Sequence, residues 1–238
     1  MKKFIKNLVK LIIINTPYFV LENFIKNFFR NHYERKKSKN LEKIYYKNFI
    51  TIDKKTKWFC YNLQFLTKNL PKINTTLKIK KILEIGSYEG RSAIFFITFF
   101  NYAKIYCVDT WKGSDEHKKN IFKRVEKNFD LNTFSYLNDK KLIKVKTDSD
   151  SFFKKNSMIF DLIYLDGDHD AFQVAKDLDN AWSCLSDGGV LILDDYLWWF
   201  YKNLKKNPSS PINNFLRINK TKISKIIVWN QILIKKKL

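Results

Sequence analysis

Cysteine, proline and glycine are scarce in this chain of 238 residues, which has 3, 4 and 6 of them respectively. The cysteines are widely spaced and form no C-x-x-C pair. This pattern argues against a disulfide framework or a zinc site and indicates reduced, buried thiols in a cytoplasmic protein. Hydrophobic residues make up 45% of the sequence. That fraction supplies a buried core and argues against global disorder.

Acidic residues and arginine are also few. The chain has 45 basic and 23 acidic residues, a formal net charge of +22 at pH 7. Nearly all of the basic residues are lysine. Proteins that read nucleic acids more often use arginine, because its planar guanidinium binds phosphates and base edges through two parallel hydrogen bonds. We therefore expect no specific nucleic-acid partner, and a coding bias toward lysine accounts for much of the charge. The charge still favours salt-sensitive association with anionic membranes, RNA or acidic glycans.

Residues 1–50 are predicted to form a basic amphipathic helical extension and a linker. Apolar residues recur at helical spacing among lysines, and a break at 15–17 separates two helical segments. No apolar run is long enough to span a bilayer, and no signal-peptide cleavage site follows. We favour a helical cap packed on the domain or on a second subunit of a homo-oligomer. The alternative is an interfacial anchor that gives peripheral membrane contact.

Strands and helices alternate over residues 51–238. Predicted strands cover 81–85, 105–108, 142–146, 160–165, 190–193, 222–228 and 231–235, and predicted helices cover 51–75, 92–100, 116–129 and 171–185. This alternation predicts an α/β fold: a Rossmann-like, doubly wound, mostly parallel seven-stranded sheet with an antiparallel last strand. Pro71 is expected to stop the first of these helices, and residues 187–189 the last. Ligands of such sheets bind beyond the carboxyl ends of the strands.

Two glycines follow the first strand, in the segment E-I-G-S-Y-E-G-R-S that starts at Glu84. Gly86 and Gly90 let the backbone turn sharply and approach a ligand closely, and amides at the next helix start can receive a carboxylate. The spacing matches neither G-x-G-x-x-G nor a P-loop. Glycines needed for packing alone remain an alternative interpretation.

Polar residues also follow the second and third strands. Asp109 ends the second strand, about twenty residues after the glycine turn, where a carboxylate accepts both hydroxyls of a ribose. Helix capping is the alternative for this residue. Thr110 follows, and Trp111 either covers an adenine edge or packs in the core. Asp148 and Ser149 come after the third strand, where they face an adenine or form a turn.

Acidic residues gather at the ends of the next two strands. Asp166 ends the fourth strand, and Asp194 and Asp195 end the fifth. Three carboxylates at neighbouring strand ends suit Mg²⁺ or another hard divalent cation. Asp168 and His169 lie beside them, and either side chain is suited to remove a proton from a substrate hydroxyl. Capping and turn formation remain the alternative for each single aspartate.

Three motifs, taken in order, resemble the class I S-adenosylmethionine (SAM)-dependent methyltransferases of the methyltransferase-24 type. They are ILEIGSYEGRSA, VDTWKGSDEH and FDLIYLDGDHDAFQVAKDLDNAWSCLSDGGVLILDDY. They are similar to metal-dependent O-methyltransferases that act on sugars and catechols. The resemblance covers roughly residues 56–238, and residues 1–50 have no part in it.

The resemblance implies a SAM site built from the candidate cofactor residues: Glu84, Gly86, Ser87, Gly90, Asp109, Thr110, Trp111, Asp148, Ser149 and Asp166. Glu84 and the glycine turn would surround the methionine end of SAM. In the metal-dependent relatives, the positions that match Asp166, Asp194 and Asp195 hold Mg²⁺. Asp168, or its neighbour His169, would then be the catalytic base.

The expected activity is methylation of a hydroxyl on a small molecule or on a sugar or glycan intermediate. Aromatic residues at 198–201 would line the acceptor pocket, or pack. One alternative is an inactive binding protein of the same fold that associates with membrane or RNA. Another is an NAD-dependent oxidoreductase on a similar sheet, although the missing G-x-G-x-x-G and the second carboxylate cluster argue against it.

Overall fold

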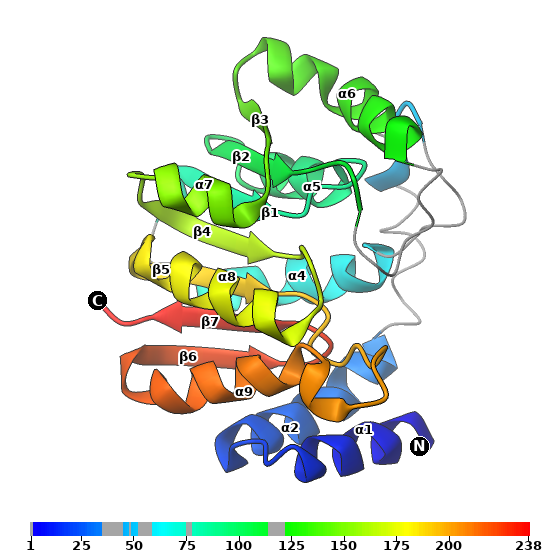
Figure 1. The fold of residues 1–238 in the computed structure, drawn as a ribbon, viewed down its shortest axis with the longest axis vertical. Helices are drawn as coiled ribbons and strands as arrows, with labels where there is room; N and C mark the ends of the chain where they lie inside the picture. Colours follow the sequence, from blue (N-terminus) through cyan, green and yellow to red (C-terminus); the bar gives the residue numbers. More distant parts are fainter. Residues whose placement is uncertain (1, 35–44, 48, 52–58, 75–77, 114–121) are drawn as a thin grey trace.

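The computed structural model describes residues 2–34, 45–47, 49–51, 59–74, 78–113 and 122–238. In this part of the chain a twisted sheet carries helices on both faces (Figure 1). The helices are α1 (Lys2–Ile13), α2 (Tyr18–Glu34), α4 (Cys60–Ile73), α5 (Arg91–Phe99), α6 (Phe122–Asn138), α7 (Ser149–Lys155), α8 (Ala171–Ser183) and α9 (Ser209–Ile218). Two 3₁₀ turns, η3 (Leu204–Lys206) and η4 (Lys220–Lys222), flank α9. The strands are β1 (Lys81–Ile85), β2 (Lys104–Asp109), β3 (Leu142–Lys146), β4 (Phe160–Leu165), β5 (Leu185–Leu193), β6 (Ile223–Val228) and β7 (Ile232–Lys236).

The seven strands have the order β3-β2-β1-β4-β5-β7-β6. The pairs from β3 to β5 are parallel, whereas β7 runs antiparallel to both β5 and β6. The predicted Rossmann-like fold with an antiparallel last strand is therefore confirmed. The strand order reverses between β1 and β4, so the carboxyl ends of these two strands form the topological switch point.

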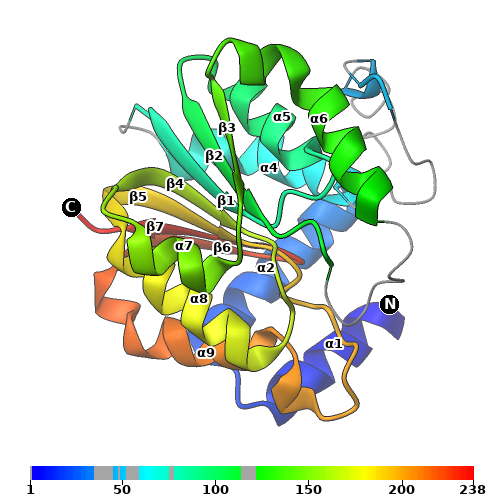
Figure 2. The same cartoon turned by 45° about the horizontal axis from the view of Figure 1, so that its top comes forward.

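Helices lie on both faces of the sheet (Figure 2). Helices α4, α5 and α6 cover one face and α7, α8 and α9 the other, and each face has its own hydrophobic core. Successive strand residues point to opposite faces: Tyr164 of β4 belongs to the first core and Ile163 to the second. Cys107 and Cys184 are buried free thiols, as predicted. The side chain of Cys60 lies outside the described residues.

Several element boundaries differ from the predictions. Helix α4 continues past Pro71 to Ile73, because a proline in the last turn removes only one backbone hydrogen bond. Strand β5 starts at Leu185 and runs through the predicted helix stop at 187–189, since Leu185 pairs with Phe160 of β4. Helix α6 extends beyond residue 129 to Asn138, where buried polar side chains hold weakly helical residues in place. Helix α7 was not predicted. The start of the predicted helices 51–75 and 116–129 falls on residues 52–58 and 116–121, outside the described part.

The N-terminal helices pack on the domain, which is the favoured alternative from the sequence. Asn23 of α2 binds the open edge of β6 with its side-chain amide: Nδ2 donates to Ile226 O (3.1 Å), and Oδ1 accepts from Val228 N (2.8 Å). This contact satisfies two backbone groups of an edge strand that would otherwise be open to another chain. The domain boundary near residue 50 stays a prediction. Among the described residues, every helix falls short of what a bilayer span requires.

Candidate functional site

The carboxyl ends of four parallel strands meet at one rim of the sheet. Backbone hydrogen bonds of 2.9 Å join the residue after one strand to the end of its neighbour: Gly86 N to Val108 O, Asp166 N to Ile85 O, and Asp194 N to Leu165 O. Gly86, Asp109 and Asp166, which the sequence assigns to one ligand site, therefore lie at a common rim. Their roles toward a ligand remain predictions.

The two glycines after β1 are required by the backbone itself. Gly86 has a φ of +87°, and a Cβ at this position would lie 1.9 Å from the carbonyl oxygen of Asp166. Gly90, at the start of α5, has a φ of +81°, and its Cβ would lie 2.8 Å from Cγ2 of Thr133. Only glycine adopts such angles without strain. Gly86 thus permits the turns after β1 and β4 to approach each other closely at the rim.

Glu84 is a carboxyl buried under this turn. Its Oε2 accepts a hydrogen bond from Ser87 Oγ (2.6 Å). Among the described residues, no hydrogen-bond donor meets its Oε1. Burial raises the pKa of Glu84 from its ordinary value of 4.5 to about 7, although the bond from Ser87 opposes this change. Glu84 therefore offers an acceptor atom in a place where an unpaired one is costly.

Asp109 ties the turns after β1 and β2 together. Its Oδ2 accepts from the backbone amides of Ser87 and Tyr88 (2.9 Å each), and its Oδ1 accepts from that of Trp111 (2.6 Å). A carboxylate has roughly four acceptor directions, so one remains for a ligand hydroxyl. The observed contacts add an organising role to the predicted ribose-binding one.

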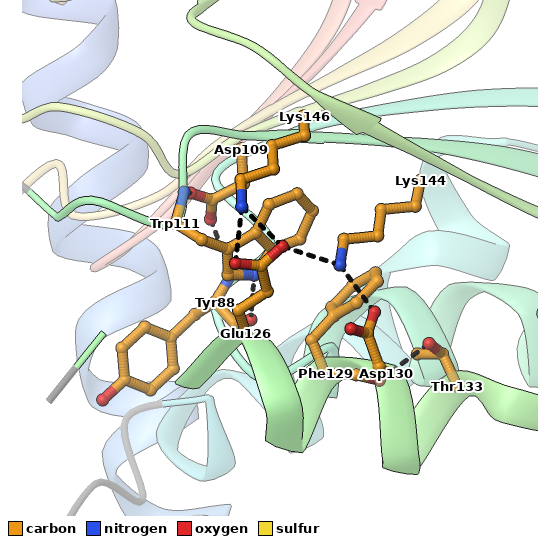
Figure 3. A network of polar contacts seen from close by, with 9 residues as sticks. All are labelled: Tyr88, Asp109, Trp111, Glu126, Phe129, Asp130, Thr133, Lys144 and Lys146. Atoms are coloured by element: carbon orange, nitrogen blue, oxygen red, sulfur yellow. Dashed lines mark hydrogen bonds and ion pairs between the residues drawn. The ribbon is translucent and has the colours of Figure 1, made fainter. Parts of the chain in front are cut away.

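Trp111 packs inward, which favours the packing alternative over an adenine contact (Figure 3). The side chain is buried, its Nε1 donates to Tyr88 O (2.9 Å), and its ring lies 4.8 Å from that of Phe129. Lys144 covers the ring, with Nζ 4.6 Å from its centre. The neighbouring Thr110 is half-buried, and its Oγ1 accepts from a backbone amide in the same turn.

An ionic network clamps α6 onto β3 beside Trp111 (Figure 3). Lys144 donates to Glu126 (3.0 Å) and Asp130 (2.6 Å), and Lys146 donates to Glu126 (2.7 Å). The network fixes α6 next to the turn that Asp109 organises.

Asp148 and Ser149 lie next to Asp109 at the rim, because Thr147 N donates to Asp109 O (3.1 Å). Asp148 is exposed and caps α7 through Ser151 N (2.7 Å), a bond that lowers its pKa. Ser149 Oγ accepts from Gln173 (3.1 Å). The structure thus assigns Asp148 the capping role, and its contact with an adenine stays a prediction.

The main ionisable cluster consists of Asp166, His169 and Asp195. His169 Nε2 lies 3.2 Å from Asp195 Oδ2 and 3.6 Å from Asp166 Oδ1. The three side chains offer ligand atoms that all lie within 4.8 Å of one another. Burial raises the pKa of Asp166 to about 6, and the nearby His169 opposes this effect. The cluster is suited to a cation or to proton transfer.

Asp194 is predicted to be a metal ligand, but both oxygens of its carboxyl group accept hydrogen bonds from protein groups. Asn62 Nδ2 donates to both of its oxygens (3.1 and 2.8 Å), the Tyr164 hydroxyl donates to Oδ2, and Asp195 N donates to Oδ1 (2.7 Å). Burial, together with the charges of Asp166 and Asp195, raises its pKa well above the ordinary value. The carboxyl group of Asp194 is thus bound by side chains of α4 and β4. The third side chain near Asp166 and Asp195 is that of His169.

The two candidate bases point in different directions. Asp168 is exposed, and its Oδ1 accepts from Asp170 N (3.0 Å) in its own turn. His169 faces the cluster, and its ring lies 4.9 Å from that of Trp198. Trp198 in turn stacks on Phe200 at 5.0 Å. His169 is therefore better placed than Asp168 to act as a base. Trp199, next to Trp198 in the sequence, lies away from the cluster and donates a hydrogen bond to Asn7 of α1.

Sequence reasoning missed three polar residues of this region. Asn62 is 132 positions from Asp194 and gave no signal beyond being one polar residue in an apolar helix stripe. Tyr164 stands two positions before Asp166, and a tyrosine so close to a strand end was a usable signal. Asp177 is buried on α8, has a pKa raised to about 6 by burial, and lines a shallow cavity with Asp166 and His169.

Fold and rim together define a Rossmann-like methyltransferase architecture. Residues 83–196 match a family model described as a methyltransferase domain. The matched segment contains the second and third motifs that carry the resemblance, and all of the first motif except Ile82. The predicted relation to class I SAM-dependent methyltransferases is therefore confirmed. No curated protein sequence matches the chain.

Solved structures with this fold are numerous but distant in sequence. An O-methyltransferase from Bacillus cereus in complex with S-adenosylhomocysteine (SAH) has 16% identity and a TM-score of 0.52, with 74% of this chain and 80% of that one covered. The SAH-bound methyltransferase PaMTH1 of Podospora anserina has 15% identity and a TM-score of 0.53, over 85% and 96%. MycE, a mycinamycin-pathway methyltransferase in complex with Mg, SAH and mycinamycin VI, has 14% identity and a TM-score of 0.56, over 84% and 54%. At these identities the likeness supports the fold.

Proposed function

We propose that this protein transfers the methyl group of SAM to a hydroxyl oxygen of a small molecule or of a sugar or glycan intermediate. The observation that carries the proposal is the position of His169. Its Nε2 lies 3.2 Å from Asp195 at the rim where Asp166 adjoins the glycine turn of the family motif. A base held at that point faces a site whose other residues suit an adenosyl ligand.

The residues at the rim fit SAM. Glu84 Oε1 is a buried acceptor without a donor among the described residues, which suits an ammonium group. Asp109 keeps one acceptor direction for a ribose hydroxyl, and Asp148 and Ser149 lie beside it for the adenine. When bound, SAM supplies a methyl group activated by a positive sulfur, and the sulfur keeps the electron pair of the broken bond, which leaves SAH.

His169 takes the proton in this proposal. The acceptor hydroxyl loses its proton to Nδ1 of the imidazole as its oxygen gains the methyl group, because Nε2 faces the carboxylates of Asp195 and Asp166 and keeps its own hydrogen. Asp195 orients the ring, and Asp166 supplies a second negative charge beside it. General base catalysis contributes about 10²–10⁴-fold to a rate, and correct alignment roughly 7–11 kcal/mol.

Asp166 and Asp195 also fit a hard divalent cation. Mg²⁺ prefers oxygen ligands, so the two carboxylates would hold it while His169 remains the base. The cation would lower the pKa of the acceptor hydroxyl. Asp194, the third predicted ligand, is bound to Asn62 and Tyr164, so we assign it to supporting Asp195.

The aromatic residues beside His169 favour an acceptor with a flat apolar face. Phe200 is 57% exposed and stacks on Trp198, which contacts the imidazole. Tryptophan and phenylalanine faces of this kind stack on sugar rings. A sugar or glycan intermediate is accordingly the acceptor we propose.

Transfer of a labelled methyl group tests the proposal directly. The purified protein is incubated with methyl-labelled SAM and a fractionated cell extract, and the labelled product is treated with base to distinguish ethers from esters. Label in a hydroxyl-bearing fraction is expected, and its loss in excess EDTA would assign the cation a role. Full activity in EDTA would remove the cation from the mechanism.

Two further measurements separate the alternatives. Calorimetry should detect binding of SAH and none of NAD, and the reverse result would favour an oxidoreductase. His169→Gln should lower kcat at least about 100-fold with SAH affinity retained, whereas Asp168→Asn should have little effect. If both variants keep full activity, His169 is not the base.

A further inference from the structure

The outer side of α1 carries four apolar side chains that no described residue covers. Ile5, Val9, Ile12 and Ile13 are 52%, 49%, 58% and 65% exposed. Their spacing puts them on one surface of the helix. Single exposed apolar residues are ordinary, but a continuous row of four on one helix indicates an interaction surface. We call these residues the apolar stripe.

The opposite side of α1 is firmly attached to the domain. Phe4 is buried with its ring 4.5 Å from that of Phe28, and Leu11 is fully buried. Asn7 accepts a hydrogen bond from Trp199 Nε1 (3.2 Å). The helix therefore has core contacts on one side, and the apolar stripe lies on the other side, where none of the described residues covers it.

Lysines border the stripe. Lys2, Lys3 and Lys6 are exposed on α1, and no acidic residue occurs in the sequence before Glu22. The surface thus joins apolar side chains to a cluster of positive charge. Two copies of the chain that met through this face would bring their lysines together, which opposes association. An anionic lipid surface instead supplies the opposite charge and an apolar layer beneath it.

We propose that α1 docks this protein on the surface of an anionic lipid bilayer. The helix lies parallel to the surface with the apolar stripe among the outer segments of the acyl chains. Lys2, Lys3 and Lys6 reach the lipid phosphates. A helix of 12 residues is too short to span the bilayer, so docking is peripheral.

Docking by α1 would bring Trp198 and Phe200, the aromatic residues beside His169, near the bilayer. Helix α1 lies beside the segment between β5 and η3 in both views (Figures 1 and 2). Lys10 Nζ lies 4.7 Å from the ring centre of Trp199, and the adjacent Trp198 contacts His169. The docking surface and the rim are thus joined through two consecutive tryptophans. The proposal does not depend on the activity, because α1 and its stripe exist whatever the rim catalyses.

Vesicle flotation of the full chain tests the proposal. Wild-type protein is compared on vesicles of phosphatidylglycerol with phosphatidylcholine and on pure phosphatidylcholine. The double variant Ile5→Ser/Ile12→Ser keeps every charge and should reduce partitioning onto the anionic vesicles at least about tenfold. Phe134→Ser is the matched control, because Phe134 is 63% exposed on the distant helix α6. It should bind like the wild type.

Each result of the flotation experiment either supports the docking proposal or overturns it. The proposal is supported if the wild type binds anionic vesicles, the stripe variant loses binding and the control keeps it. It is overturned if the wild type does not bind, or if the stripe variant binds as well as the wild type, because net charge alone then explains association. It is also overturned if light scattering finds a dimer that the stripe variant converts to a monomer. Should the double variant unfold by circular dichroism, Ile13→Ser makes the same comparison at the most exposed stripe position.

Discussion

Replacing Glu84 by glutamine isolates the energetic effect of one buried carboxyl at the rim. Burial raises its pKa from 4.5 to about 7, so the folded state favours the protonated form. The stability that this group contributes is complete below pH 4.5 and is lost as the pH rises through 7. Each unit of pKa is worth about 1.4 kcal/mol, so the whole change corresponds to roughly 3 kcal/mol. Glutamine keeps an acceptor for Ser87 Oγ but does not titrate.

The assay is urea unfolding of both chains between about pH 5 and about pH 8, where roughly 2–3 kcal/mol of the change falls. The free energy of unfolding of Glu84→Gln, minus that of the wild type, should rise by this amount with pH. The difference between the chains cancels other groups that titrate in the same range. Asp139→Asn, at an exposed carboxyl after α6, is the control for removing a negative charge, and the rise for Glu84→Gln should exceed any change it shows. A flat difference for Glu84→Gln would refute the reasoning.

Three other perturbations test the contacts that form the rim and its surroundings. Gly86→Ala should lose at least about 3 kcal/mol of stability, because its Cβ would lie 1.9 Å from a backbone oxygen at positive φ; an unchanged Tm would contradict this. Asn23→Ala should lower the urea midpoint by the equivalent of about 1–2 kcal/mol, since two backbone groups of β6 lose their partners. An equal midpoint would assign Asn23 no role at the sheet edge. Trp198→Ala should raise the acceptor KM about tenfold with SAH affinity unchanged, measured by steady-state kinetics and calorimetry.

The fold could be predicted because its signals are local. Short apolar runs that end in glycine or aspartate define β1, β2, β4 and β5, and the alternation of strands with helices predicts a parallel sheet. Boundaries failed where tertiary contacts override local preference. Strand β5 runs through Gly188 and Gly189 because Leu185 pairs with Phe160, a partner that local sequence does not specify.

The residues of the site were only partly predictable for the same reason. Gly86, Asp109 and Asp166 follow strands, and parallel topology alone brings strand ends together. The direction in which each side chain points depends on partners far away in sequence. Asp194 turns to Asn62 of α4, and Trp111 turns under Lys144 of β3. Position along a strand predicts the rim, but it does not predict which carboxyl faces a ligand.

The carboxyl groups near the rim bear on the choice between a binding site and a set of residues that only cap or pack. Glu84, Asp166, Asp177 and Asp194 all have raised pKa values, chiefly because they are buried. A raised carboxyl pKa means that ionisation near neutral pH destabilises the fold. Capping or turn formation, the alternative for each residue alone, is served by exposed carboxyls such as Asp148, whose pKa is lowered. Three buried carboxyls and the half-buried Asp166, kept near one sheet rim at the expense of stability, support the proposed site, because a ligand that offsets their charge would recover that stability.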